Sequence, residues 1–176
     1  MITKKTIFII IGSASANSVN EKIIHHLVNT TTTYWETIVF KDLKSLPHFD
    51  PELSIDNTPQ EIISFRNNIE KADGVIICTP EYIFSIPSGL KNAIEWCVST
   101  TLFTDKPTGL LTASASGEKG HAELQLIFQT LMAKFTDQTT LLIQGAKGKI
   151  NEEGNFTHEK TKEDFYLFLN SFKSLL

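Results

Sequence analysis

Short apolar runs alternate along this chain with stretches in which apolar residues recur every three or four positions. Apolar runs bounded by turn residues predict buried strands, and recurrence at helical spacing predicts amphipathic helices. A helical pattern follows each apolar run, so we expect five strands and five helices in alternation. The predicted strands are residues 6–11, 35–40, 74–79, 106–113 and 139–143.

The helical patterns also predict which side chains face the core and where two helices begin. Capping boxes at Ser18-Val-Asn-Glu21 and Thr58-Pro-Gln-Glu61 predict the starts of the first two helices. Residues 145–156, which are rich in Gly and Asn, predict an exposed loop. The predicted inward-facing residues are Ile23, Ile24, Leu27 and Val28; Ile62, Phe65 and Ile69; Leu90, Ala93, Ile94 and Cys97; Leu124, Ile127, Phe128, Leu131 and Phe135; and Phe165, Phe168, Leu169 and Phe172.

This alternation predicts an α/β three-layer sandwich, because parallel strands need crossover connections that place helices on both faces of the sheet. Right-handed crossovers and the number of elements favour the flavodoxin-like strand order 2-1-3-4-5. In that order a crevice opens at the carboxyl ends of strands 1 and 3. We expect residues 1–176 to form a single domain, with no internal repeat.

Composition narrows the class of protein. The chain has 176 residues, 41% of them hydrophobic and 20% charged, with a formal charge of −4. We therefore expect neither a nucleic-acid surface nor a membrane span. The basic start and the apolar run 6–11 resemble a short signal core but lack a convincing cleavage site. Cys78 and Cys97 predict buried thiols rather than a disulfide, which favours a cytoplasmic protein.

The loop after the first predicted strand is rich in small polar residues. Small side chains let backbone N–H groups approach an anion closely, and the following helix start adds partial positive charge. This composition predicts a phosphate site that contains almost no cations, although an ordinary Ser/Asn turn before a capped helix has the same composition. The loop matches neither the Walker A nor the Rossmann pattern. Its donors are Ser13, Ser15, Asn17, Ser18 and Asn20.

The segment Thr79-Pro-Glu-Tyr-Ile-Phe-Ser-Ile-Pro-Ser-Gly-Leu-Lys-Asn-Ala-Ile-Glu-Trp96 joins the third strand to a helix through two prolines. It resembles the strand-loop-helix signature of the NADPH-dependent FMN reductase family, flavodoxin-like flavoproteins that include quinone, azo and chromate reductases. The resemblance implies that Pro80, Glu81, Tyr82 and Ile83 pass beside the flavin ring of FMN. Ile83 replaces a common asparagine. Glu81, the only carboxylate in the loop between the strand and the helix, is also a candidate for proton transfer.

The resemblance extends to the other loops. The family pattern Gly-Ser-x-Arg-x-x-Ser-x-Asn matches at Gly12, Ser13, Ser18 and Asn20, and Ser15 stands where arginine is usual. It implies that this loop, with Val19 at the helix start, holds the FMN phosphate. The loop after the fourth strand resembles a Ser-x-x-Gly segment that lies against the flavin, here Ser114 and Gly117.

The implied activity is an FMN-dependent oxidoreductase that takes hydride from NADPH or NADH. The reduced flavin then reduces a quinone, azo, metal or free-flavin acceptor. Because this chemistry belongs to the cofactor, we predict binding residues, no catalytic residue and no metal. The family forms homodimers or tetramers, and Phe84, Phe103 and Trp96 form either an apolar contact patch or part of the core.

Two alternative functions remain open. One is a non-catalytic FMN-binding electron carrier or redox-responsive module. The other is a flavodoxin-like enzyme that processes sugars or nucleotides without flavin. Among the remaining candidates, the adjacent His25 and His26 point to different helix faces and make a poor metal pair.

Overall fold

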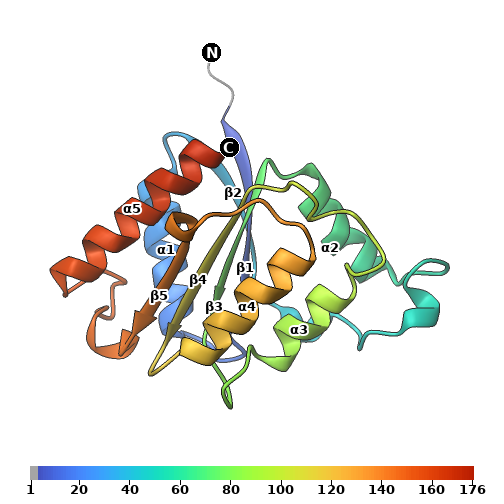
Figure 1. The fold of residues 1–176 in the computed structure, drawn as a ribbon, viewed down its shortest axis with the longest axis horizontal. Coiled ribbons are helices and arrows are strands. Elements are labelled where there is room, and N and C mark those ends of the chain that lie inside the picture. Colours follow the sequence, from blue (N-terminus) through green and yellow to red (C-terminus); the bar gives the residue numbers. More distant parts are fainter. Residues whose placement is uncertain (1–3) are drawn as a thin grey trace.

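The computed structural model describes residues 4–176, which form a parallel sheet covered by helices (Figure 1). The predicted alternation is confirmed, with small shifts at the ends of elements. The strands are β1 (Lys5–Ile11), β2 (Trp35–Phe40), β3 (Gly74–Thr79), β4 (Thr108–Ser114) and β5 (Thr140–Gln144). The α-helices are α1 (Val19–Thr31), α2 (Gln60–Lys71), α3 (Ser88–Glu95), α4 (Glu118–Thr130) and α5 (Glu159–Leu175).

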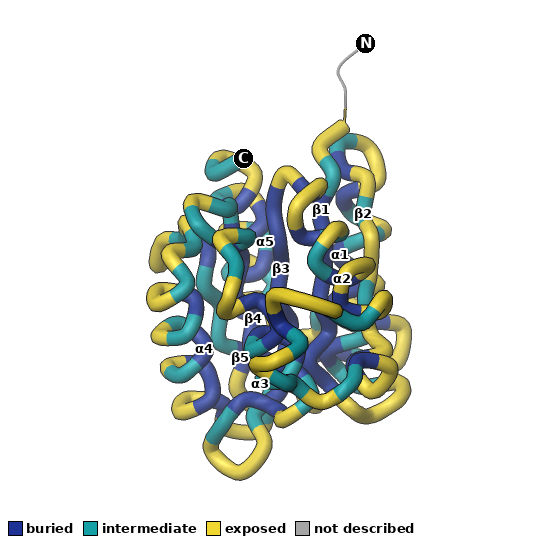
Figure 2. The backbone as a smooth tube through the Cα atoms, turned by 90° about the vertical axis from the view of Figure 1, so that its right-hand side faces the viewer, coloured by how far each residue is buried: buried dark blue, intermediate teal, exposed yellow. Residues whose placement is uncertain are grey.

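The five strands are all parallel and follow the order β2-β1-β3-β4-β5, as predicted. β3 lies at the centre and every residue in it is buried (Figure 2). β2 and β5 are the edges, and the exposed positions of β2 lie along one of them. This order brings the carboxyl ends of β1, β3 and β4 together.

Two apolar clusters fill the space between the sheet and its helices. One unites alternate strand residues with the inner faces of α2, α3 and α4. The other unites the remaining strand residues with α1 and α5. The predicted three-layer sandwich is confirmed, because alternation along each strand sends successive side chains to opposite faces.

Both cysteines are buried and unpaired, as predicted. Burial raises the pKa of the Cys97 thiol to about 12, and burial also raises the pKa of Cys78. Both therefore behave as small apolar residues in the two clusters.

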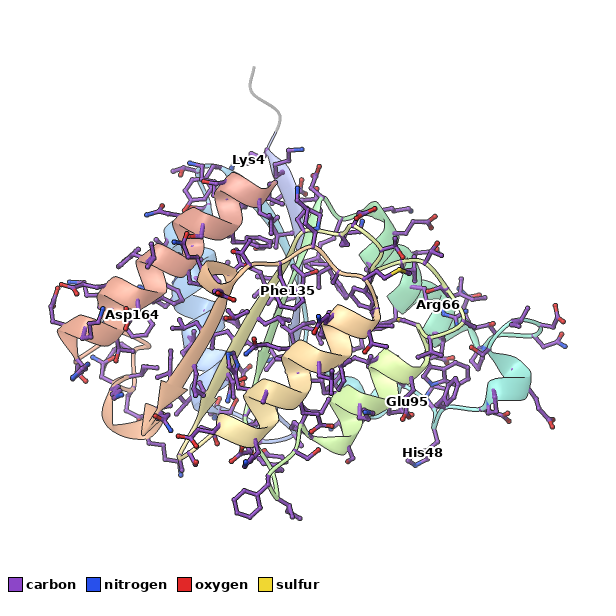
Figure 3. The ribbon with its side chains drawn as sticks, viewed as in Figure 1. Lys4, His48, Arg66, Glu95, Phe135 and Asp164 are labelled. Atoms are coloured by element: carbon purple, nitrogen blue, oxygen red, sulfur yellow. The ribbon has the colours of Figure 1, made fainter. Side chains whose placement is uncertain are left out.

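Three local predictions are wrong. Thr58 does not cap α2: its hydroxyl donates to Leu53 O at 2.9 Å, and Pro59 occupies the N-cap position. Helix α4 ends at Thr130, so Phe135 (labelled in Figure 3) lies beyond it, although it still packs on the same cluster. The loop after β5 is only partly exposed, because it contains Ile150, which is buried in the α1–α5 cluster.

Candidate functional site

Three loops leave the carboxyl ends of β1, β3 and β4 at one edge of the sheet. The strand register pairs Ile11 with Cys78 and Thr79 with Thr112, so the loops begin side by side. The Gly12 N–H donates to Cys78 O at 2.8 Å. A Cβ on Gly12 would lie 2.4 Å from Thr79 Oγ1, so a side chain here would push the first two loops apart.

In the first loop, hydroxyl and carboxylate groups hold the backbone at the start of α1. Ser18 is the N-cap residue, and its Oγ accepts the Glu21 N–H at 3.2 Å. The Glu21 carboxylate accepts the N–H of Asn17 at 3.0 Å rather than that of Ser18, so the predicted capping box is only half formed. Ser13 Oγ accepts the Ser15 N–H at 3.2 Å, which closes the preceding turn.

This helix start fits a phosphate group. The first N–H groups of a helix lack intrahelical acceptors, and Ser18 satisfies that of Glu21, which leaves those of Val19 and Asn20 for an anion. The side chains of Ser15 and Asn17 are exposed beside them. Together with the positive end of the helix dipole, these donors suit the FMN phosphate.

The side chain of Asn20 has a different place from the other predicted donors. It is buried, its amide nitrogen donates to Ala113 O at 3.1 Å, and its amide oxygen accepts from Cys78 Sγ at 3.3 Å. It therefore links α1 to β3 and β4. Only the backbone N–H of Asn20 is left for a phosphate.

The second loop contains a tight turn from Tyr82 to Ser85. Their backbones exchange hydrogen bonds of 2.9 and 3.1 Å. The two central residues, Ile83 and Phe84, have φ of 51° and 58°. That is type I′ geometry, which normally selects Asn and Gly, and it is strained for a β-branched side chain. Strain of this kind occurs most often at binding and active sites.

Tyr82 connects the second loop to the first. Its hydroxyl lies 3.4 Å from Ser15 Oγ, and its ring is about half-exposed. Hydrogen bonds with Ser15 and then Ser13 lower the pKa of Tyr82. The predicted residues Ser13, Ser15 and Tyr82 are thus brought together. Ile83 is 95% exposed and projects from the turn instead.

Two carboxylates fix the second loop to α4. Glu81 accepts the N–H groups of Gly117 and Gly120 at 3.1 and 2.8 Å, so it caps α4 from another part of the chain. Glu123 accepts from Ser85 Oγ at 2.6 Å and from Ile86 N–H at 3.1 Å. These contacts give Glu81 a positioning role and offer no support for proton transfer by it.

The third loop runs from Ser114, which is half-buried, to Gly117, the N-cap residue of α4. Gly117 has φ of 87°, which favours glycine, and its N–H already donates a hydrogen bond to the Glu81 carboxylate. Nearby, His121 is buried with Nδ1 2.9 Å from Thr112 Oγ1, and burial lowers its pKa.

A surface hollow lies elsewhere on the described part of the chain. It has a volume of about 760 Å³ and is lined by residues of α2, of the segment before α2 and of the segment after α3, none of them from the three loops. Arg66 lines it (Figure 3), but its guanidinium donates to Trp96 O at 2.8 Å and Ser54 O at 2.9 Å. The arginine is therefore committed to holding α2 against its neighbours, and the hollow is a poor candidate for the functional site.

Burial and spacing decide the remaining questions about metal ligands, apolar patches and membrane helices. Within residues 4–176, no group of three or more His, Cys, Asp or Glu side chains is placed to bind a metal. Trp96 and Phe103 belong to the core, whereas Phe84 is 74% exposed. No helix in the described part of the chain combines the length and apolarity needed to span a membrane.

Strand order and the position of the three loops define the class of protein: a flavodoxin-like α/β protein. In proteins of this class, ligands bind at the carboxyl ends of the strands where the strand order reverses, which here are β1 and β3. A family model for NADPH-dependent FMN reductase matches residues 6–147. The chain belongs to this family of oxidoreductases, in which FMN is the cofactor and a nicotinamide the co-substrate.

Similar proteins include several bacterial reductases. The chain is 31% identical to the NADH:(hydroxy)cinnamate reductase subunit CrdA of Vibrio ruber, over 85% of this chain and 76% of that one. It is 27% identical to a 2-hydroxy-1,4-benzoquinone reductase of Burkholderia, over 94% and 93%. The structure of FerB, an NAD(P)H:(acceptor) oxidoreductase of Paracoccus denitrificans, superimposes with a TM-score of 0.77 at 24% identity, covering 97% and 98%, and supports the fold.

Proposed function

We propose that this protein is an FMN-dependent NAD(P)H oxidoreductase that reduces small quinone-type acceptors in the cytoplasm. The observation that carries the proposal is the junction of two loops at the carboxyl edge of the sheet. There a helix start with free N–H groups lies beside the loop predicted to contact the flavin, and the contact between Ser15 and Tyr82 joins them. Similar proteins of Burkholderia and Escherichia coli are named quinone reductases, which supports a quinone as the acceptor.

Each loop has a role in this proposal. Ser13, Ser15, Asn17 and Ser18, with the N–H groups of Val19 and Asn20, bind the phosphate of FMN. The backbone from Pro80 to Ile83 and the ring of Tyr82 contact the flavin, and Glu81 keeps that loop in place. Ser114 and Gly117 form the third side of the site.

When bound, FMN would supply the chemistry of hydride transfer between the nicotinamide and the acceptor. The protein then has to anchor the phosphate, orient the flavin and leave one face of the ring open to both substrates in turn. Accordingly, we assign binding and positioning residues to the chain and no catalytic residue or metal ligand.

We also propose that the protein acts as a homodimer or a tetramer, as the resemblance implied, and that residues 1–176 form one domain. Large apolar side chains exposed on or next to α3 and α4 support an interface there. Val98, Leu126 and Met132 are each more than 60% exposed. Burial of such side chains against a second copy would stabilise the assembly. We expect neither nucleic acid nor membrane as a partner.

An anaerobic titration tests the proposed activity. Purified protein, or protein reconstituted with FMN, should show a flavin spectrum that one equivalent of NADPH or NADH bleaches and that a quinone restores. A protein that binds FMN but is reduced by neither nicotinamide would instead be an electron carrier. Failure to bind FMN, with turnover of a sugar or nucleotide, would refute the flavin-based proposal.

A further inference from the structure

The proposed phosphate site has a carboxylate at its edge and no cation in its own loop. Residues 12–20 carry no Lys or Arg, and the first charged residue of α1 is Glu21. The Glu21 carboxylate accepts the Asn17 N–H at 3.0 Å, so its charge is held at the helix start. A phosphate dianion bound there would be repelled by this carboxylate at short range.

Lys41 is the cation that compensates this charge. It directly follows β2, and Phe40 pairs with Ile10 of β1, so Lys41 reaches the same edge of the sheet as the first loop. Its Nζ lies 2.5 Å from Glu21 Oε1. The hydrogen bond from Lys41 is the main cause of the lowered pKa of Glu21, which is therefore ionised at neutral pH.

The neighbouring lysine on α1 does not take this role. Lys22 Nζ lies 2.6 Å from Glu152 Oε2, in the loop after β5. Its side chain is only 19% exposed, so it is held in that pair. The Lys41 side chain is 65% exposed, and its ammonium has three N–H donors, of which Glu21 uses one.

We propose that Lys41 binds the FMN phosphate. Its ammonium neutralises Glu21 and also donates a hydrogen bond to the phosphate. The inference rests on the proposed binding of FMN at the first loop. It predicts that Lys41 contributes to the affinity for FMN and not to the affinity for riboflavin, which has the same ring but no phosphate.

Titration of the apoprotein with FMN and with riboflavin, followed by flavin fluorescence, tests this inference. We expect Lys41→Met to weaken FMN binding roughly threefold to tenfold, the range of a partly exposed ion pair, and to leave riboflavin binding unchanged. Lys41→Arg, which keeps the charge, should retain FMN binding. Raising the salt concentration should weaken FMN binding less in Lys41→Met than in wild type.

Lys44→Met is the matched control, because Lys44 is exposed three residues further on and its loss changes the net charge equally. An equal FMN affinity in the two methionine variants would refute the assignment of Lys41. So would equal weakening of FMN and riboflavin, or loss of binding in Lys41→Arg. If wild-type protein binds neither flavin, the proposed function itself fails, which is a different result.

Discussion

Replacement of Ile83 by Asn should stabilise the protein. Ile83 and Phe84 are the central residues of the type I′ turn, with φ of 51° and 58°. A β-branched side chain disfavours this left-handed conformation, whereas Asn adopts it readily. Because the Ile83 side chain is 95% exposed, its removal sacrifices little packing.

The expected gain follows from the backbone alone. An L-residue in the left-handed region is less stable than in the right-handed region by about 1–2 kcal/mol, and Asn avoids part of this cost. A small change in the unfolded state is the main opposing effect. The net gain should be about 1 kcal/mol in the free energy of unfolding. For a chain of this size, that raises Tm by about 2–4 °C.

Thermal and urea unfolding of the apoprotein measure this gain. Ile55→Asn is the matched control, because Ile55 is 78% exposed and is not among the residues with positive φ. Subtracting its effect removes the general consequence of replacing a surface isoleucine. If Ile83→Asn is no more stable than Ile55→Asn, the turn is not strained and the reasoning is wrong.

Three further perturbations test other parts of the site. Gly117→Ala should destabilise the protein by at least about 1–2 kcal/mol in urea unfolding, because φ is 87° and the new Cβ would lie 2.8 Å from Leu142 Cδ1. An unchanged urea midpoint would contradict the left-handed conformation of this N-cap residue. Glu123→Gln should cost about 1 kcal/mol and speed hydrogen exchange at Ile86 N–H, whereas unchanged exchange would show that Glu123 does not hold this loop. Burial lowers the native pKa of His26 and His121 below 6.5, so the unfolded chain binds more protons than the native protein as the pH falls. The free energy of unfolding should therefore keep its full value above pH 6.5 and decrease below it, and equal urea midpoints at pH 7.5 and 5.5 would refute this.

The sequence was sufficient for the strands, their order and the buried helix faces, because burial imposes a period on apolar residues. Phe65 and Phe168, for example, were placed on the correct faces by spacing alone. The first loop was also recognisable, since Ser18 caps α1 by a contact between near neighbours in the chain. Local chemistry of this kind leaves a local pattern.

The contacts that hold the loops of the site in place are not visible as a pattern in the sequence. Glu123 holds Ser85, and Glu81 holds Gly120, across separations of 38 and 39 residues. The positive φ of Ile83 runs against the preference of its side chain and arises from the fixed ends of the turn. Asn20 is a residue type suited to phosphate binding, yet its side-chain amide joins α1 to β3 and β4. Tertiary contacts decide each of these cases.

The walls of the site differ in how easily they can move. On one side, Glu81 and Glu123 together make four hydrogen bonds of 2.6 to 3.1 Å with α4 and the second loop. On the other side, the side-chain link between the first and second loops is the 3.4 Å contact of Tyr82 with Ser15. The side-chain contact that holds the first loop to the second is therefore longer than any of the four that hold the second loop to α4. In the proposed FMN site, the loops after β3 and β4 thus form the more rigid wall and the loop after β1 the more adaptable one.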